Sequence, residues 1–256
     1  MATDVEEPTS DVSEYLKRKY ETNAWKYWDQ FYKHNTVNFF KDRHWLINEW
    51  PELTEKSQDS SKKVLLEVGC GVGNGMFPLA KENSDLFIHG IDFSPKAIEF
   101  VKANTEYDPS RMSAHVCDIT SDVLVQSMAP SSVHIVLMCF VLSAICPEKM
   151  EAAVRNIVSV LADNGLVLFR DATRGDLSQT RFKKGHKLAP NFYVKQDGTR
   201  VYYFAQDEIK DLFLRCGLEA LDVSFCERKI VNRKEGLEMN RMWLQGKFRK
   251  RPVLTL

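Results

Sequence analysis

Three glycines at alternating positions follow an apolar run in LEVGCGVGNG, residues 66–75. Without side chains, Gly69, Gly71 and Gly73 let the backbone turn tightly and approach a ligand closely. The spacing G-x-G-x-G differs from the dinucleotide pattern G-x-G-x-x-G, because Asn74 stands where that pattern needs its third glycine. Glu67 lies two residues before the first glycine, where a ligand with an amino-acid group would place its ammonium. The turn therefore predicts binding of a nucleoside that carries an amino acid.

Two aspartates further along the chain complete a ligand set. Asp92 ends the apolar run LFIHGID and is placed to accept hydrogen bonds from both hydroxyls of a ribose. Asp118 ends SAHVCD, where a carboxylate can receive an adenine amino group. Each residue alone has a structural reading, because strand-end aspartates often cap the next helix. Together and in this order, the glycines, Glu67 and the two aspartates resemble the S-adenosylmethionine site of class I methyltransferases.

A second stretch, NFFKDRHW at residues 38–45, gathers aromatic rings and positive charge without an apolar period. Stacking surfaces beside cations suit an unpaired nucleobase and its phosphates. Stray aromatics at the edge of a core are the alternative interpretation. We expect Phe39 and Phe40 to stack on a base or wall its pocket, and Lys41, Arg43 and His44 to meet phosphates or the base edge.

The elements that position these residues follow a regular alternation of apolar runs and helical patterns. Strands are expected at 63–69, 86–92, 113–118, 133–142 and 165–171, with two late strands near 218–226 and 239–247. Helices are expected near 75–82, 95–104, 147–161 and 207–216. This order is typical of an α/β fold, a Rossmann-like domain with a mostly parallel seven-stranded sheet and helices on both faces. Ligands bind at the carboxyl edge of such a sheet, which brings Glu67, Asp92 and Asp118 together.

The flanking segments define the domain organisation. Residues 1–12 are acidic and expected to be disordered, and 13–53 form an N-terminal helical lid and RNA-binding segment, helical from Glu14 to about Lys33. A polar linker at 54–63 leads into a methyltransferase domain at 64–248, and a basic tail follows at 249–256. An insertion at 172–204, after the fifth strand, carries a hairpin signal at Asp197-Gly198.

Composition excludes several classes of protein. Lys plus Arg and Asp plus Glu both number 35, so any nucleic acid must be held by a local patch rather than by net charge. The six cysteines form no C-x-x-C pair, which argues against a zinc ribbon or a disulfide framework and favours a reducing compartment. No apolar run approaches a membrane span, and the acidic start is unlike a secretory signal. We expect a cytoplasmic protein, with the nucleus as the second location, no membrane partner and no metal.

The longest resemblance covers residues 24 to 247. The segments KYWDQFYKHNTVNFFKDRHWL, LEVGCGVGN, IDFSPKAIE, FVLSAICPEKM, VLFRD, RFKKG and NFYVKQDGTRVYYF occur in the order seen in the tRNA N3-methylcytidine methyltransferases, to which the chain is similar. The resemblance implies methylation of N3 of cytidine 32 in the anticodon loop of certain serine, threonine or arginine tRNAs. S-adenosylmethionine is the implied methyl donor and S-adenosylhomocysteine the product.

The resemblance also implies roles for individual residues. Cofactor contacts fall on Trp28, Tyr32, Gly69, Asp92, Asp118, Ile119 and Cys139, with Trp28 and Tyr32 bringing the N-terminal helix over the cofactor. Beyond what the resemblance implies, we expect Arg43 and Asp171 to be catalytic. A carboxylate near the cytosine amino group stabilises the positive charge that the base gains, and Asp171 ends the fifth strand at the edge where ligands bind. A salt bridge with a neighbouring arginine is the alternative for Asp171. Acceptor contacts beyond residues 38–45 are expected from Arg170, Arg181, Lys183, Lys195 and Arg200.

One position departs from the family pattern. Family members commonly read Arg-Asp-Tyr after the fifth strand, whereas this chain reads Arg170-Asp171-Ala172. The tyrosine is gone, which affects the details of the pocket rather than the reaction.

Alternatives stay open at this stage. A methyltransferase acting on a protein or small molecule fits the glycine turn equally well, but leaves FFKDRHW unexplained. A non-catalytic subunit that binds RNA or a partner is the second alternative, and an NAD-linked oxidoreductase is a distant one. A helper such as a seryl-tRNA synthetase fits the balanced charge, and a monomer is expected.

Overall fold

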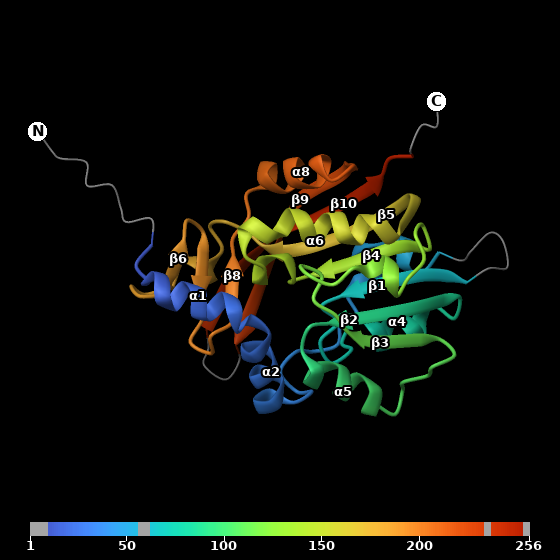
Figure 1. Cartoon of the computed structure of the whole chain (residues 1–256), viewed down its shortest axis with the longest axis horizontal. Coiled ribbons are helices and arrows are strands. Elements are labelled where there is room, and N and C mark those ends of the chain that lie inside the picture. Colours follow the sequence, from blue (N-terminus) through green and yellow to red (C-terminus); the bar gives the residue numbers. More distant parts are fainter. Residues whose placement is uncertain (1–9, 56–61, 233–236, 253–256) are drawn as a thin grey trace, which may run out of the picture.

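A computed structural model describes residues 10–55, 62–232 and 237–252. Within these residues, seven strands form one sheet in the order β3-β2-β1-β4-β5-β10-β9 (Figure 1). The parallel strands are β1 (Lys63–Val68), β2 (Leu86–Asp92), β3 (Met112–Val116), β4 (Val133–Cys139) and β5 (Leu161–Ala172). β9 (Leu218–Asn232) and β10 (Leu237–Lys250) close the sheet as an antiparallel pair. The predicted mostly parallel seven-stranded sheet is confirmed.

Helices cover both faces of this sheet, as the sequence predicts. One apolar core packs α6 (Pro147–Val160) and α8 (Gln206–Arg215) against it. A second core on the opposite face holds α4 (Met76–Glu82), α5 (Pro95–Ala103) and the short α3 (Leu46–Glu49). Proline stands in the first turn of α5 and α6, where its missing N–H removes no helical bond. The Ser94 side chain caps α5 by accepting from the amide of Ala97.

The N-terminal helical stretch is divided in two. α1 (Glu14–Thr22) ends at Asn23, and α2 (Ala24–Asn35) begins directly after it. The Asn23 side chain donates to the carbonyl of Lys19, 2.9 Å away, which is the local competition that makes asparagine favourable at helix ends. This break lets α1 lie along the insertion while α2 packs on α5 (Figure 1).

The insertion after β5 forms its own small sheet. It contains α7 (Leu177–Thr180), β6 (Lys187–Ala189), β7 (Phe192–Val194) and β8 (Arg200–Tyr202), with β7 and β8 antiparallel. The predicted hairpin turn is present: the Asp197 carboxylate accepts from the Thr199 amide, and Gly198 has φ +82°. Short 3₁₀ turns occur at Pro51–Leu53, Leu124–Gln126 and Leu142–Ala144.

The N-terminal segment fastens this insertion. The Asp11 carboxylate accepts from the amides of Gly185 and Lys187, and Val12 packs on the apolar cluster around Leu188. Disorder is expected over residues 1–12, but the segment is ordered from Ser10 onward. Residues 1–9 lie outside the described part. The predicted linker lies largely outside it as well. Of the expected tail, Arg249 and Lys250 belong to β10, and residues 253–256 are not described.

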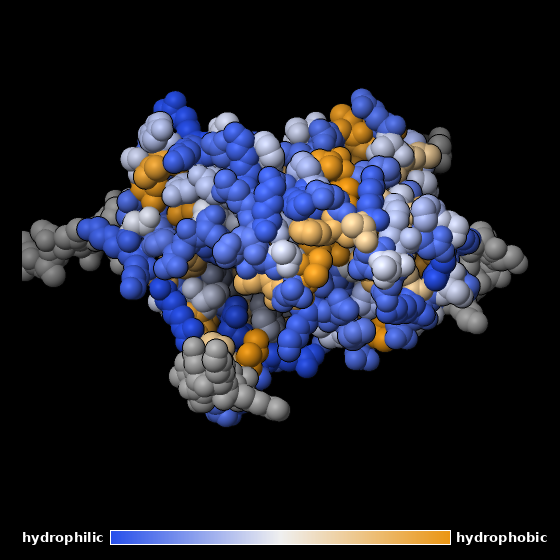
Figure 2. Space-filling view, turned by 90° about the horizontal axis from the view of Figure 1, so that it is seen from below, coloured by the Kyte–Doolittle hydropathy of each residue, from blue (hydrophilic) through white to orange (hydrophobic). Residues whose placement is uncertain are grey.

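The surface is mostly hydrophilic on the side shown in Figure 2, and its apolar residues occur in separate patches. Among the described residues, no helix is long and apolar enough to span a membrane.

Candidate active site

A cavity of about 410 Å³ opens at the carboxyl edge of the parallel strands, between them and α2. Six residues of the predicted cofactor set line it: Trp28, Tyr32, Gly69, Asp92, Asp118 and Ile119. This placement follows from topology, because β1, β2 and β4 are neighbours and their carboxyl ends meet.

Asp92 is a buried carboxylate on the floor of the cavity. Its Oδ2 accepts from the Gly71 amide at 3.0 Å and its Oδ1 from the Ser94 amide at 2.9 Å. Burial raises the pKa of Asp92 to about 6, against these hydrogen bonds, which lower it. Each oxygen keeps a further lone pair, so the side chain can still accept from a ribose diol.

Asp118 lies in the turn that follows β3, on the same side of the cavity. Its Oδ1 accepts from the Thr120 amide at 2.9 Å and from the Thr120 hydroxyl at 2.8 Å. Because Thr120 holds Oδ1, the orientation of the carboxylate is fixed, and its Oδ2 can accept a hydrogen bond from an adenine amino group.

The glycine turn approaches α2 closely. Gly71 has φ +56°, and a Cβ built there would lie 2.8 Å from the Tyr32 hydroxyl. Gly69 has φ +61°, and its Cβ would meet Val141 at 2.4 Å. Gly71 and Gly73 do not line the cavity, so their contribution is to shape the turn beneath the lid.

Glu67 lies behind this turn rather than in the cavity wall. Its carboxylate is buried, neither oxygen has a hydrogen bond with a described group, and Oε1 is 3.9 Å from Arg43 Nη1. Burial raises the pKa of Glu67 to about 7, although the Arg43 charge opposes this. Glu67 therefore does not line the cavity where the predicted contact with a ligand ammonium would require it. The buried Glu67 oxygens can still accept a hydrogen bond from a polar group beside the cofactor cavity.

The lid is an aromatic cluster on α2. The rings of Trp28 and Tyr32 lie 6.1 Å apart, and Phe31 packs edge-on against both. Asp29, on the same helix, accepts from the Ser94 hydroxyl and the Lys96 amide, each at 2.9 Å. These bonds fix α2 to the start of α5, so the lid is tied to the strand that carries Asp92.

The segment 38–45 docks on the glycine turn. The Arg43 amide donates to the Asn74 carbonyl at 2.8 Å, and the Asn74 side chain donates to the Phe40 carbonyl and to Asp42. Asn74 thus has a structural use at the position where dinucleotide folds need glycine. The Arg43 guanidinium reaches the Cys139 carbonyl at 3.5 Å, at the end of β4.

The other members of this segment divide into two kinds. Phe39 and Phe40 pack against each other and against Phe31 at 4.8–5.7 Å, and remain 57% and 38% exposed. Lys41 and His44 are exposed and form no ion pair with any described residue. Beside the glycine turn the structure thus presents the Lys41 ammonium, the His44 imidazole and two partly exposed phenylalanine rings.

Two residues expected to contact the acceptor form ion pairs within the chain instead. Arg170 is 4% exposed, pairs with Glu49 at 3.1 Å and lies 3.9 Å above the Trp45 ring. Arg200 is buried, pairs with Glu21 and donates to the Ala144 carbonyl at 3.1 Å. Because both charges are neutralised within the chain, their role is structural, although Arg200 also borders the cavity.

Asp171, the expected catalytic carboxylate, is fully buried and does not line the cavity. Its Oδ2 accepts from the Ser143 amide at 3.0 Å and its Oδ1 from the Ala172 amide at 2.8 Å. Burial raises its pKa to about 6. These bonds fix the loop after β4, so the geometry gives Asp171 a positioning role rather than direct contact with the acceptor.

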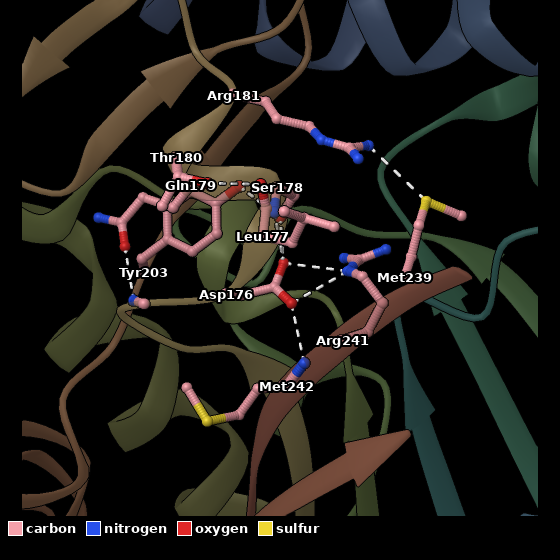
Figure 3. Close-up of polar contacts among 11 residues, drawn as sticks. Asp176, Leu177, Ser178, Gln179, Thr180, Arg181, Tyr203, Met239, Arg241 and Met242 are labelled. Carbon is pink, nitrogen blue, oxygen red and sulfur yellow. Dashed lines mark hydrogen bonds and ion pairs between the residues drawn. The ribbon is translucent and has the colours of Figure 1, made fainter. Parts of the chain in front are cut away.

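The remaining predicted cations stay available. Lys183 and Lys195 are exposed and have no carboxylate partner in the described part of the chain; Lys195 Nζ lies 5.9 Å from the Trp28 ring. Among the described residues, Arg181 meets only the Met239 sulfur, at 3.7 Å (Figure 3). By contrast, Lys247 pairs with Glu52, and Arg249, from the expected basic tail, pairs with Glu219.

Sequence reasoning missed several residues of the cavity wall, including Trp25, Phe140, Val141, Cys146 and Lys149. Four of them lie in the segment FVLSAICPEKM, which carries the resemblance, but nothing in their types marks a cofactor contact. Trp25 comes from α2, Phe140 and Val141 from the loop after β4, and Cys146 and Lys149 from the start of α6. The position of that loop at the carboxyl edge of the sheet was the available signal. No group of described side chains is arranged to hold a metal ion.

The cavity fits S-adenosylmethionine. Two carboxylates are placed for the ribose and the adenine, a glycine turn leaves room for close backbone approach, and aromatic rings cover the opening. Cys139 is buried at the end of β4 but does not line the cavity, so its predicted contact is limited to the neighbouring backbone.

Comparisons with solved structures support this fold. A methyltransferase from Anabaena variabilis superposes with a TM-score of 0.65 at 17% identity, over 90% of this chain and 96% of that one. Another neighbour, the 1,6-didemethyltoxoflavin-N1-methyltransferase of Burkholderia thailandensis, contains bound S-adenosylhomocysteine (TM-score 0.60, 13% identity, 92% and 91% covered). A third is a Haloferax volcanii methyltransferase in complex with the activator Trm112 (TM-score 0.59, 13% identity, 92% and 98% covered). At these identities the likeness concerns the fold alone.

Sequence comparisons are more specific. A family model described as a methyltransferase domain matches residues 66–167. The human tRNA N(3)-cytidine methyltransferase METTL6 is 46% identical over 94% of this chain and 85% of its own length. The Danio rerio METTL2 enzyme is 39% identical over 96% of this chain and 79% of its own. These similarities include the lid, the segment 38–45 and the insertion as well as the cofactor site, and the chain therefore belongs to the tRNA N(3)-cytidine methyltransferase family.

Proposed function

We propose that this protein transfers the methyl group of S-adenosylmethionine to N3 of a cytidine in tRNA. The observation that carries the proposal is the docking of segment 38–45 on the glycine turn through Arg43, Asn74 and Phe40. This docking places cations and rings suited to RNA beside a cavity suited to the cofactor.

The chemistry requires little from the protein beyond alignment. Neutral cytosine carries an in-plane lone pair on N3, so no strong base is needed to create the nucleophile. A bond forms between N3 and the methyl carbon, the carbon–sulfur bond breaks, and its electron pair stays on sulfur while the base gains positive charge. The bound cofactor supplies the methyl group. Positioning and electrostatic stabilisation therefore account for the catalysis.

The residues of the chain have distinct parts in this reaction. Arg43 and the free cations hold phosphates of the acceptor strand, since each reaches solvent without a full carboxylate partner. Buried Glu67, with Oε1 3.9 Å from Arg43 Nη1, helps to hold that guanidinium in place. Asp171 fixes the loop after β4 through the Ser143 amide.

N3 lies on the Watson–Crick edge, so the target cytidine must be unpaired or extruded. We propose cytidine 32 of the anticodon loop as the target, in serine, threonine or arginine tRNAs, on the strength of the family resemblance. A helper protein, with a seryl-tRNA synthetase as the first candidate, forms part of this proposal because the net formal charge is +0. All six cysteines are free, which supports a reducing location such as the cytoplasm or the nucleus.

Arg43→Ala tests the assignment. The purified protein is given labelled S-adenosylmethionine and total tRNA from a strain lacking the gene, and 3-methylcytidine is measured by nucleoside mass spectrometry. We expect transfer to fall by about tenfold or more, as for other lost charge-assisted contacts, while cofactor affinity measured by calorimetry stays within about threefold.

Arg249→Ala is the matched control, because that guanidinium is already paired with Glu219. It should leave both quantities near the wild-type values. Equal loss of transfer and of cofactor affinity in Arg43→Ala contradicts the assignment, and transfer to a peptide or metabolite with inert tRNA establishes a different acceptor.

A further inference from the structure

Two aromatic rings and two guanidinium groups form a continuous row beyond the cofactor cavity. The Arg43 guanidinium lies 5.8 Å from the centre of the Phe140 ring. The Phe140 ring is 6.2 Å from Trp243, with the ring planes at 76°. Arg241 follows, 5.5 Å from the Trp243 ring. We call this set the aromatic row.

Phe140 is held at the start of the row in an unfavourable backbone conformation. Its φ is +61°, a region that a bulky side chain rarely adopts because it is strained. The strain persists because the neighbouring backbone fixes it: the Phe140 amide donates to the Arg170 carbonyl at 2.8 Å, and Asp171 holds Ser143. The surroundings therefore keep one ring at the edge of the sheet.

That ring is not part of the core. Phe140 is 37% exposed and borders the cofactor cavity, directly after β4. A core aromatic at this position would gain from burial and would have no need of left-handed backbone. Strain that presents an exposed ring at the ligand edge of a sheet is the pattern of a binding residue.

Trp243 occupies the second position through strand pairing. It lies directly opposite Ala172 on β5, so its side chain is on the face of the sheet that Ala172 shares. Ala172 is the place where the family pattern commonly carries tyrosine. The small residue leaves the Trp243 ring partly exposed beside Phe140.

Arg241 is anchored at the far end of the row, as Figure 3 shows. Its Nε donates to both oxygens of Asp176, at 3.0 and 3.1 Å, and the same carboxylate accepts from the Met242 amide at 2.8 Å. The two terminal nitrogens of Arg241 have no hydrogen-bond acceptor among the described residues, so a fixed guanidinium presents free donors. Arg181 lies on the same side, over Met239 (Figure 3).

We propose that Phe140 stacks on the target cytosine and Trp243 on the base next to it, with Arg43 and Arg241 meeting the phosphates on either side. The inference rests on the proposed function and deepens it. Because the planes of Phe140 and Trp243 are nearly perpendicular, two bases stacked on them are nearly perpendicular as well. An extruded base has this orientation relative to the neighbouring base on which it no longer stacks. Phe39 and Phe40 then belong to the lid cluster around Phe31 rather than to the base platform.

Four variants of the full chain separate stacking from packing. Phe140→Leu and Trp243→Leu keep an apolar side chain without a π-face, whereas Phe140→Tyr and Trp243→Phe keep the ring. Phe225→Leu is the matched control: Phe225 is a 50% exposed ring of β9 whose partner on β10 is Leu244, so it lies on the face opposite Trp243.

Methyl transfer to total tRNA from a strain lacking the gene is measured at several tRNA concentrations. The leucine variants should lose about ten- to a hundredfold in kcat/KM, the range of one lost base stack. Phe140→Leu should act mainly on kcat, because the target base loses alignment, and Trp243→Leu mainly on KM. Tyrosine and phenylalanine should restore most of the loss, and cofactor affinity should stay near the wild-type value throughout.

The outcomes divide clearly. If wild-type protein methylates tRNA and the leucine variants match Phe225→Leu, the aromatic row is not a base platform, while the proposed function stands. Failure of the ring-keeping variants to restore activity, or a parallel loss of cofactor affinity, also overturns the inference by giving the rings a structural role. If wild-type protein itself methylates no tRNA, the proposed function fails first.

Discussion

The cofactor side and the acceptor side of this site are assembled in different ways. Around the cofactor cavity, Gly69, Asp92 and Asp118 come from the ends of three neighbouring parallel strands, and both carboxylates accept from a backbone amide two residues further along the chain. On the acceptor side, Arg43, Phe140, Lys195 and Arg241 come from four segments far apart in the chain. The first side is specified by local sequence, and the second depends on how separate segments pack.

Charge use differs between the two sides as well. On the cofactor side the Asp92 carboxylate is buried, and burial raises its pKa to about 6, whereas Asp118 is partly exposed. On the acceptor side, carboxylates of the chain already neutralise Arg170 and Arg200, whereas Arg181 has no carboxylate partner within the described ranges. A residue type alone is therefore a weaker guide to acceptor binding than its partner.

The largest effect is expected from Gly71→Ala on the cofactor side. A Cβ there lies 2.8 Å from the Tyr32 hydroxyl and the backbone has φ +56°, so the lid must move. We expect S-adenosylmethionine affinity, measured by calorimetry, to fall by about tenfold or more. Gly217→Ala is the control, with φ +86° but open space around its Cβ. It should lower stability by about 1 kcal/mol and leave affinity unchanged.

Asp171→Asn should reduce kcat by about tenfold, because the loop after β4 loses an acceptor for the Ser143 amide. Hydrogen exchange of the Ser143 amide, followed by NMR, should accelerate in parallel. Loss of the rate with unchanged exchange would instead show that Asp171 acts directly on the acceptor, as the sequence alone suggests.

Comparing Arg181→Ala with Arg249→Ala tests whether a cation contributes to tRNA binding only when no carboxylate of the chain already pairs with it. Removing the unpaired Arg181 should weaken tRNA binding by about two- to fivefold and lower the slope of log affinity against log salt by about one. Removing Arg249, which Glu219 already neutralises, should change neither quantity in a filter-binding titration. Equal effects would show that ion pairing within the chain does not decide acceptor binding.

The smallest effect is a pH dependence carried by Glu67. Its folded pKa is about 7 and an unfolded glutamate titrates near 4.3, so the folded state binds more protons between these values. Stability of the wild-type protein should therefore fall as pH rises from about 4 to about 7 through this residue. Glu67→Gln removes that loss, and its melting temperature relative to wild type should be higher at pH 7.5 than at pH 5. A difference independent of pH contradicts the buried, partly protonated state.

Much of the fold follows from local pattern. The alternation of apolar runs and helices predicts the mostly parallel seven-stranded sheet with helices on both faces, because connections between parallel strands leave few topologies. The cofactor residues follow for the same reason: a glycine turn and strand-end aspartates are adjacent in sequence to the elements that place them. Asn23 was not anticipated as a break, since the apolar spacing continues across it and only its side-chain bond to Lys19 ends α1.

The acceptor side was predictable only in part. The segment around Arg43 was recognised by its composition, but the burial of Arg170 against Trp45 depends on the approach of α3 to β5 and β10. Phe140 lies in the segment FVLSAICPEKM, but its residue type does not indicate a ligand contact, and its importance comes from a backbone angle. Contacts between distant segments and unusual dihedral angles are properties of packing that residue types alone do not determine.

The most direct test of the account is to map the methyl group. Purified protein, S-adenosylmethionine and total tRNA from a strain lacking the gene are combined, with cell extract added in a parallel reaction to supply a helper. Because a methyl group on N3 blocks Watson–Crick pairing, reverse transcription stops at each modified base, and nucleoside mass spectrometry identifies it. The account predicts new 3-methylcytidine with stops at cytidine 32 of the anticodon loop. Methylation of another base, or of no tRNA in either reaction, would contradict it.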